Sequence, residues 1–434
     1  MSSAAAAIIS VVLLVFLFFL RMQVAYVMAL VGFLGFCYIA SVEGALSILA
    51  KDFWVMFSSY SLTVVPMFVF MGTVAFYSGM GGRLYDATYK FIGHQRGGLA
   101  LATILACAGF GAMCGSTNAE AAAMGKVTLP EMKRYNYDDS LATACVAAAG
   151  SLAILIPPST ILIIYGIMTE ESIGKLFAAG ILPGLLLTTL FAITIYILCR
   201  WKPSLGPAGA KATWKERIKS LTGVIEMFLL FGLVMGGLFV GWFTPTEAGA
   251  AGAAGALIIA LARRRLSWRG FLDALADTTR ITAMVFLIVT GATIFGHFMS
   301  VTRVPFELAE WVGGLAMPPF VIMGFIIFGY LIGGCFMDSL ALITLTIPIL
   351  YPLVLSLGFD SIWFGVIIVL VAEMGVITPP VGINVYVIKG VAPDVPLETI
   401  FKGIFPFLGA IIVCTAILIA FPQVALFLPG FMMW

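Results

Sequence analysis

Charged side chains are scarce in this chain: they make up 10% of its 434 residues, whereas 62% of the residues are hydrophobic. A soluble domain carries about 25% charged residues, and a water-soluble fold of this size cannot hide so much apolar surface. The lack of charge therefore excludes a soluble protein and indicates that lipid is the solvent. The net charge of +2 comes without a basic tract that could follow phosphates, which excludes nucleic acid as a partner.

Residues that serve metal centres and catalysis are scarce as well. The two histidines, His94 and His297, lie far apart, and none of the seven cysteines forms a CxxC pair. We therefore interpret the cysteines as small buried hydrophobic residues and expect no cofactor. The sequence contains no P-loop, no HExxH motif and no Ser-Lys or paired Asp arrangement in an apolar run. We expect neither an ATPase nor an intramembrane enzyme.

Long apolar runs dominate what remains and predict an all-α polytopic membrane protein, since they can cross a hydrocarbon core of about 30 Å. They lie at residues 4–20, 24–42, 60–80, 140–168, 173–199, 221–241, 247–262, 281–300, 361–390 and 398–421. Two further apolar runs, 97–130 and 318–355, are interrupted by polar residues near their middles. We predict that each is a re-entrant hairpin of two half-length helices, whose tip must be buried in protein or face water.

Lys and Arg are distributed unevenly and predict which loops are cytoplasmic. Residues 82–139 around the first hairpin carry six Lys or Arg, and the matching residues 304–360 carry none. By the positive-inside rule, the first hairpin enters from the cytoplasm and the second from the periplasm. The two halves then have opposite orientations, which is the inverted-repeat architecture of many secondary transporters.

Each half also contains a Pro-Pro pair within an apolar run, Pro157-Pro158 and Pro379-Pro380. A proline removes a backbone donor and clashes with the preceding turn, so 140–168 and 361–390 are predicted to be interrupted helices. Free carbonyls at such a break suit a hard cation such as Na⁺, and the N-terminus of the next half-helix suits an anion. One Pro-Pro pair could merely kink a helix, but two in matching positions beside polar hairpins favour binding.

The predicted site combines the hairpin tips with the interrupted helices. Residues expected to bind the cation, Na⁺, are Cys114, Gly115, Ser116, Ala153, Ile156, Pro158, Gly334, Asp338, Thr378, Pro379 and Gly382. Residues expected to contact an anionic substrate are Thr117, Asn118, Glu120, Ser159, Pro380 and Asn384.

Three acidic residues keep two interpretations each. Glu120 either attracts a cation and shapes the pocket, or it accepts hydrogen bonds from hairpin amides or pairs with Lys126. Asp338 supports a cation site, caps the second half-helix, or does both. For Glu373 a structural hydrogen bond is favoured over direct ligation. His297 is expected to be a packed, hydrogen-bonded histidine.

These patterns divide the chain into five parts. They are N-terminal scaffold helices (1–59), a first inverted repeat (60–199), a cytoplasmic linker with scaffold helices (200–280), a second inverted repeat (281–421) and a C-terminal tail (422–434).

Several runs together resemble a known family. They are Gly115 to Gly125 (GSTNAEAAAMG), Ile156-Pro157-Pro158-Ser159, Gly180 to Gly184 (GILPG) and Thr378 to Asn384 (TPPVGIN). Over nearly the whole chain the sequence is similar to the large membrane (M, DctM-like) subunit of tripartite ATP-independent periplasmic (TRAP) transporters. Two residues depart from the family pattern: a small or hydroxyl residue is usual where Glu120 stands, and serine is frequent where Cys114 stands.

The resemblance implies an elevator-type, Na⁺-driven secondary importer of a small organic anion (a carboxylate, sugar acid or sulfonate) in the inner membrane of a bacterium or archaeon. It also implies two partners outside this chain, a small four-helix membrane subunit and a periplasmic substrate-binding protein. The alternative is a stand-alone ion-coupled anion carrier of the same general architecture.

Overall fold

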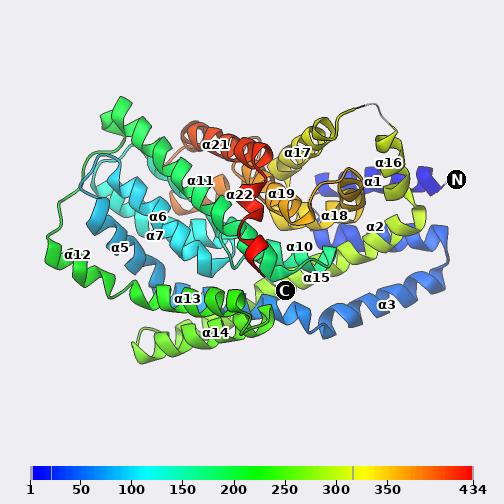
Figure 1. Cartoon of the computed structure of the whole chain (residues 1–434), viewed down its shortest axis with the longest axis horizontal. Helices are drawn as coiled ribbons and strands as arrows, with labels where there is room; N and C mark the ends of the chain where they lie inside the picture. Colours follow the sequence, from blue (N-terminus) through cyan, green and yellow to red (C-terminus); the bar gives the residue numbers. More distant parts are fainter. Residues whose placement is uncertain (1–2, 21, 315–316, 433–434) are drawn as a thin grey trace.

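The computed structural model describes residues 3–20, 22–314 and 317–432, and every regular element in these ranges is a helix. The helices lie side by side in an elongated bundle (Figure 1). The all-α prediction is therefore confirmed for the described residues.

The described residues in the first half of the chain form eleven α-helices. They are α1 (Ser3–Phe19), α2 (Val24–Ile39), α3 (Val42–Ser58), α4 (Val64–Tyr77), α5 (Met80–Ile92), α6 (Gly98–Cys114), α7 (Thr117–Arg134), α8 (Asp139–Ala149), α9 (Leu152–Leu155), α10 (Thr160–Thr169) and α11 (Ile173–Trp201).

The second half forms another eleven among the described residues. They are α12 (Trp214–Leu221), α13 (Ile225–Val240), α14 (Pro245–Ala262), α15 (Trp268–Thr302), α16 (Val304–Gly313), α17 (Pro319–Phe336), α18 (Ser339–Ser356), α19 (Ser361–Val376), α20 (Ile383–Val391), α21 (Leu397–Ala420) and α22 (Gln423–Leu426).

Membrane-spanning capacity follows from length and composition. Eight helical spans within the described ranges are long and apolar enough to cross a membrane, or nine if α3 and α4, which are bent by 55° at their junction, form one span. The chain is thus built as a multi-pass membrane protein.

Two helices differ from the apolar runs that the sequence predicts. The helix α3 was not predicted, because Glu43, Lys51 and Asp52 interrupt its apolar pattern. The helix α15 begins at Trp268 rather than at residue 281, because charged residues fill its first turns. The two helices are joined by a polar contact, since His297 Nε2 lies 3.3 Å from Asp52 Oδ1. His297 is therefore hydrogen-bonded as expected, but its side chain is 48% exposed and not packed.

Two helix pairs, α6–α7 and α17–α18, double back at a short turn. The backbone N–H of Leu99, at the start of α6, donates to the Tyr137 hydroxyl just after α7 at 3.1 Å. The ring of Phe320, at the start of α17, packs against Phe359 just after α18, with 5.4 Å between ring centroids. Each pair is therefore a hairpin. We name the turns the first tip (residues 114–118) and the second tip (residues 336–340).

The two interrupted segments, α8–α10 and α19–α20, run in opposite directions. The Tyr165 hydroxyl near the end of α10 donates to the Ser361 backbone oxygen at the start of α19 at 2.6 Å. At the other end, Lys133 Nζ before α8 lies 3.4 Å from Asp394 Oδ2 after α20. Opposite directions are what an inverted repeat requires.

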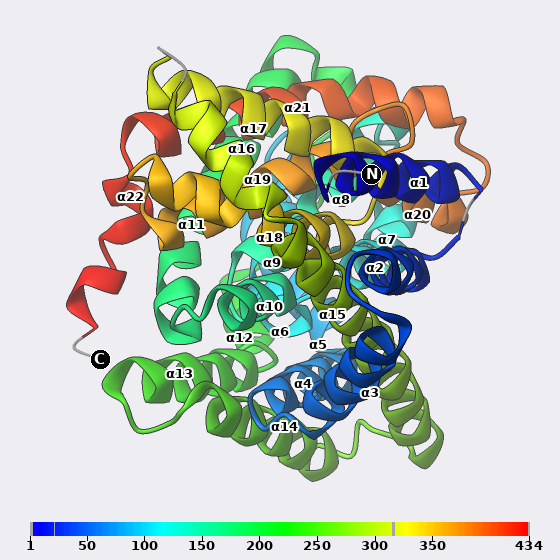
Figure 2. The ribbon, with the colours of Figure 1, turned by 90° about the vertical axis from the view of Figure 1, so that its right-hand side faces the viewer.

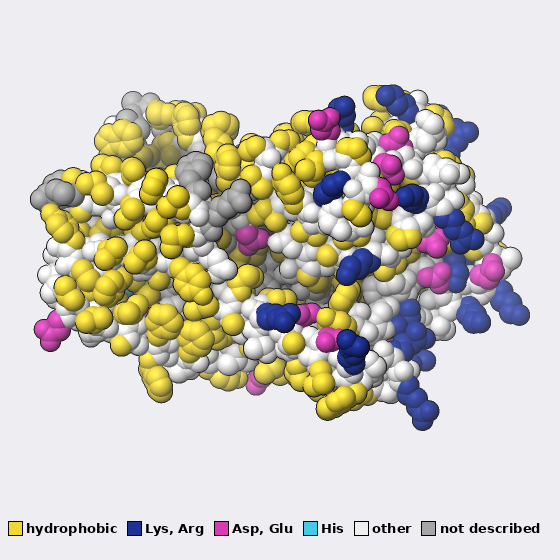
Figure 3. Space-filling model, turned by 180° about the vertical axis from the view of Figure 1, so that it is seen from behind, with side chains coloured by type: hydrophobic (Ala, Val, Ile, Leu, Met, Phe, Trp, Pro, Cys, Tyr) yellow, Lys and Arg dark blue, Asp and Glu magenta, His cyan; other side chains and the backbone are white. Residues whose placement is uncertain are grey.

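Side chains of one charge type mark one end of the molecule. Lys and Arg gather over the right half of the view in Figure 3, which is the end that carries α5 and α12 in Figure 1. We call it the basic end. Figures 1 and 2 agree that α3, α13 and α14 lie on one long side of the bundle and α17 and α21 on the opposite side.

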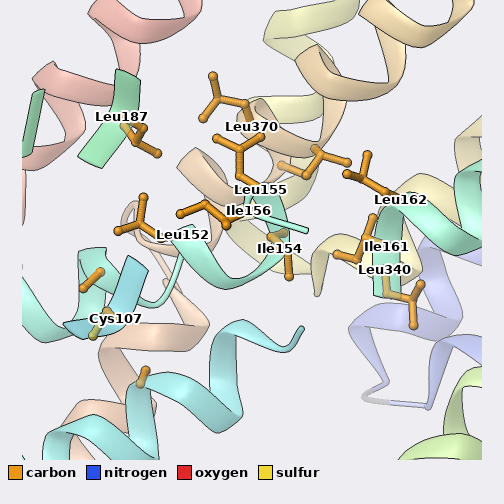
Figure 4. Close-up of a cluster of buried hydrophobic side chains, with 14 of the residues drawn as sticks. Cys107, Leu152, Ile154, Leu155, Ile156, Ile161, Leu162, Leu187, Leu340 and Leu370 are labelled. Atoms are coloured by element: carbon orange, nitrogen blue, oxygen red, sulfur yellow. The ribbon is translucent and has the colours of Figure 1, made fainter. Parts of the chain in front are cut away.

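The broken segment α8–α10 lies deep in the core. Leu152, Ile154 and Leu162 are at most 1% exposed. Figure 4 shows them together with Leu187 from α11, Leu340 from α18 and Leu370 from α19. The non-helical stretch between α9 and α10 is thus surrounded by protein, which is the condition for irregular backbone at membrane depth.

Close backbone packing between α21 and α8 gives a stability prediction. A Cβ atom at Gly403 would lie 2.0 Å from the Ser140 backbone oxygen, whereas a Cβ at Gly409 on the same helix would meet nothing within 4 Å. Gly403→Ala is expected to destabilise the protein by about 1–3 kcal/mol through overpacking. Gly409→Ala serves as the matched control and should leave the unfolding temperature in detergent unchanged or raise it slightly. Equal unfolding temperatures for both variants would contradict this packing.

Candidate functional site

The two tips meet in the interior, and one carboxyl group joins them. Glu373 in α19 is 2% exposed. Its Oε2 accepts a hydrogen bond from the Thr117 hydroxyl of the first tip at 3.1 Å, and its Oε1 accepts one from the Ser339 hydroxyl of the second tip at 2.6 Å. The preference for a structural hydrogen bond at this position agrees with the geometry.

This arrangement follows the internal repeat. Thr117 and Ser339 are separated in the sequence by the same number of residues as Pro157 and Pro379, so they occupy equivalent positions in the two halves. By the same spacing, Glu373 is equivalent to Ser151, whose side chain also approaches the Glu373 carboxyl. A single carboxyl thus gathers hydroxyls from both tips and from the first interrupted segment.

A second pair of tip residues meets beside this carboxyl. The Asn118 side chain of the first tip contacts the Asp338 carboxyl of the second tip. Asp338 also caps α18, since its Oδ2 accepts from the Leu340 backbone N–H at 3.2 Å. The capping role that the sequence allowed for Asp338 is therefore present.

The first tip lies against the break of its own half, and the second hairpin lies against the helix that precedes its break. A Cβ added to Gly115 would lie 3.1 Å from the Pro158 backbone oxygen, and one added to Gly334 would lie 2.7 Å from the Ala372 backbone oxygen. The left-handed φ of Gly115, +61°, is one that L side chains rarely adopt. Glycine lets the first tip approach its break, and α17 approach α19, backbone to backbone.

The breaks themselves leave peptide groups outside the helices. Residues 156–159 separate α9 from α10, and residues 377–382 separate α19 from α20. Both Pro-Pro peptide bonds are cis. Ser159 caps α10, with the Leu162 N–H 3.3 Å from its hydroxyl, and Gly382 precedes α20 with a φ of +62°. Of the predicted residues at the first break, Ala153, Ile156, Pro158 and Ser159, the structure brings Pro158 against Gly115 of the first tip. The predicted residues of the second break, Thr378, Pro379, Pro380 and Gly382, follow α19, whose Gly375 packs against Gly334 of α17.

Two buried amide oxygens near the tips lack a hydrogen-bond partner. The Asn384 side chain is fully buried; its nitrogen donates to the Ala147 backbone oxygen at 3.2 Å, but its Oδ1 is unpaired. Asn118 Oδ1 is likewise unpaired. Buried polar atoms are rarely left unsatisfied, so each of these oxygens can accept a further ligand. Their chemistry fits a hard cation, which prefers oxygen ligands.

Glu120 lies apart from both tips' polar contacts. Its side chain is fully buried, and neither carboxyl oxygen has a hydrogen bond of good geometry. Its nearest polar neighbours are the Cys107 thiol and the Gly111 backbone. Glu120 forms no ion pair with Lys126, which is exposed, so that interpretation is wrong.

A cavity of about 300 Å³ adjoins the first tip. Cys114 and Ser116 of the tip line this cavity. The other walls include residues that the sequence analysis missed: Thr73 and Tyr77 from α4, Lys126 from α7, Thr160 from α10, and Asp277 from α15. Asp277 was missed because the start of α15 was not predicted. Glu120, on the other face of α7, does not line the cavity.

Comparison with known proteins agrees with this geometry. Residues 11–424 match the family model described as the tripartite ATP-independent periplasmic transporter, DctM component. The chain is 36% identical over 374 residues to the large permease protein DctM of the C4-dicarboxylate TRAP transporter of Pseudomonas aeruginosa, covering 86% of this chain and 87% of that protein. It is 34% identical over 372 residues to the sialic acid TRAP large permease SiaM of Vibrio cholerae, covering 86% of each.

A solved structure shares the fold. The Alcanivorax borkumensis YdaH transporter superposes with a TM-score of 0.64 at 13% identity, covering 89% of this chain and 90% of that one. The relatives named here are transporters or permease subunits and not enzymes.

The bridge at Glu373 yields a coupling prediction. In a double-mutant cycle of Ser339→Ala and Glu373→Ala, the two losses of unfolding free energy should be non-additive by about 1 kcal/mol, because both remove the same hydrogen bond. A control cycle combines Ser356→Ala, at the far end of α18, with Glu373→Ala. That cycle should be additive within error, and additive behaviour at Ser339 would contradict the bridge.

Proposed function

The chain belongs to the DctM component family of tripartite ATP-independent periplasmic transporters, and from this premise we propose that it is the transport subunit of a Na⁺-driven, binding-protein-dependent importer of a small organic anion. The observation that carries the proposal is the meeting of two polar tips and two interrupted helices in the protein interior, joined at Glu373.

Anion binding is supported by neutral donors beside half-helix N-termini. The helices α7, α10, α18 and α20 each begin at a tip or a break, so the positive ends of their dipoles face the centre. Asn118 and Asn384 supply amide groups there. These groups can contact a carboxylate or sulfonate without a buried basic residue.

Na⁺ coupling is supported by the oxygen atoms of the same region. The unpaired Asn118 Oδ1, the Asp338 carboxyl and the carbonyls of the two breaks are ligands that suit a hard cation. A bound Na⁺ supplies positive charge that favours the anion. Each net positive charge carried inward is worth about 2.3 kcal/mol per 100 mV of membrane potential, and an excess of Na⁺ over substrate charge therefore drives uptake.

An elevator movement is supported by how the helices divide. The hairpins open toward opposite ends of the molecule, as re-entrant hairpins of an inverted repeat do. We assign the hairpins and interrupted segments of 60–199 and 281–421 to a moving unit, and 1–59 and 200–280 to a scaffold. The arms α4 and α15 stay with the scaffold, because α15 packs backbone to backbone on α2: a Cβ at Gly32 would lie 2.7 Å from the Phe295 backbone.

Location and partners complete the proposal. The basic end faces the cytoplasm by the positive-inside rule, with the chain in the inner membrane. A small membrane subunit binds the scaffold, and a periplasmic binding protein delivers the substrate at the opposite end. The tripartite description of the matched family supports both partners.

The decisive experiment is uptake in proteoliposomes that contain the chain, its small subunit and the cognate binding protein, with an inward Na⁺ gradient imposed or omitted. Uptake is expected only with both the gradient and the binding protein. Uptake without the binding protein, or driven by a proton gradient, would instead establish a stand-alone carrier.

A pair of aspartates allows a sharper test of the cation site. Asp338 and Asp360 each cap a helix through backbone N–H groups, of Leu340 and Trp363 respectively. Asparagine caps as well as aspartate, so Asp→Asn removes the charge and keeps the cap. Asp338→Asn is expected to raise the Na⁺ concentration for half-maximal uptake roughly tenfold, the equivalent of about 1.4 kcal/mol. Asp360→Asn, at the opposite end of the interrupted segment, should leave it unchanged. The same Na⁺ dependence in both variants would exclude Asp338 from the cation site.

A further inference from the structure

The cavity at the first tip lies between the proposed moving unit and the scaffold. One wall comes from the tip, α7 and α10, and the other from α4 and α15. The chain leaves α4 at Tyr77 toward α5, and it enters α15 from three consecutive arginines, 263–265. The cavity therefore adjoins the basic end.

The two charged residues that line this cavity, Lys126 and Asp277, differ in their partners. Asp277 Oδ2 accepts a hydrogen bond from the Tyr77 hydroxyl at 2.6 Å, and its Oδ1 lies 3.6 Å from Arg280 Nη1. Lys126, by contrast, forms no ion pair with any acidic group in the described part of the chain. Of the two charged residues that line the cavity, Lys126 is therefore the one without an ion pair among the described residues.

Free donors extend from Lys126 to the tip. Ser116 is the N-cap residue of α7 and Thr160 is the first residue of α10. Neither hydroxyl has a hydrogen-bond partner among the described residues, and both line the cavity. Between Ser116 and Lys126, one face of α7 presents Ala119, Ala122 and Ala123 to the cavity, which leaves room for a ligand.

We propose that this cavity is the compartment through which the anionic substrate leaves toward the basic end, and that Lys126 is the charge that holds its carboxylate or sulfonate group there. This inference rests on the proposed function and deepens it. The single unpaired cation selects ligands that present one negative group at a time, while the hydroxyls of Ser116 and Thr160 take the polar remainder. Lys126 is thus a specificity-determining residue at the exposed side of the cavity.

The chain contains its own reporter for this compartment. Cys114 lines the cavity and is partly exposed, and apart from Cys37 the other cysteines are buried. In a Cys37→Ser background, a membrane-impermeant thiol reagent added to the cytoplasmic face of inside-out vesicles should therefore modify Cys114. Mass spectrometry of the peptide identifies the modified residue, and Cys114→Ser should abolish the modification.

Two reagents of opposite charge test the role of Lys126. The anionic probe is 2-sulfonatoethyl methanethiosulfonate, itself an alkyl sulfonate, and the cationic probe is 2-(trimethylammonium)ethyl methanethiosulfonate. The rate of each probe with Cys114 is divided by its rate with 2-mercaptoethanol, which corrects for the intrinsic reactivity of the probe. The anionic probe should react faster, and Lys126→Gln should reduce its relative preference roughly threefold or more, as expected for loss of one nearby charge. Lys126→Arg should restore the preference.

Lys133→Gln is the matched control. Lys133 lies further along α7, does not line the cavity and pairs with Asp394. It should leave the preference unchanged. A preference that Lys126→Gln does not alter would overturn the inference. The readout needs no Na⁺ gradient, partner or known substrate, so its failure is distinct from failure of the proposed function.

Discussion

The buried carboxyl of Glu373 is the contact on which the centre of this protein depends. It accepts one hydrogen bond from the Thr117 hydroxyl and another from the Ser339 hydroxyl, and these two residues are equivalent in the two halves. Three segments far apart in the sequence are thereby held in one register. A slip of either hairpin would leave a buried polar group unpaired, and that penalty exceeds the net worth of the bond itself. The constraint therefore fixes the relative position of the two tips.

Glycine makes this meeting of tips and breaks possible. Gly115 approaches the first break, and Gly334 approaches α19, the helix that precedes the second break. Both contacts are backbone against backbone. In lipid, helix association is driven by close packing and interhelical hydrogen bonds rather than by water exclusion. Small residues at these points bring the first break within reach of the first tip, and α17 against the helix that leads to the second break.

The polar groups at the centre fall into two kinds, and the division bears on function. Glu373 has both oxygens occupied by hydroxyls, so it acts as a structural link. Asn118 and Asn384 each keep a buried oxygen without a donor, so they remain available to a ligand or cation. Groups that hold the fold and groups that bind can thus stand side by side on the same segments.

Hydropathy, the Pro-Pro pairs and the Lys and Arg asymmetry determined the helical fold, the two hairpins and the breaks, because a bilayer imposes length, internal hydrogen bonding and charge placement on any segment that enters it. These constraints act locally and can be read along the chain. They failed at α3 and at the start of α15, where charges interrupt the apolar pattern. Only the tertiary structure decided that Glu373 lies between Thr117 and Ser339, that Glu120 is buried away from Lys126, and that Asp277 faces the first tip. Such partners come from helices far apart in the sequence, and which of them meet is set by how whole helices pack.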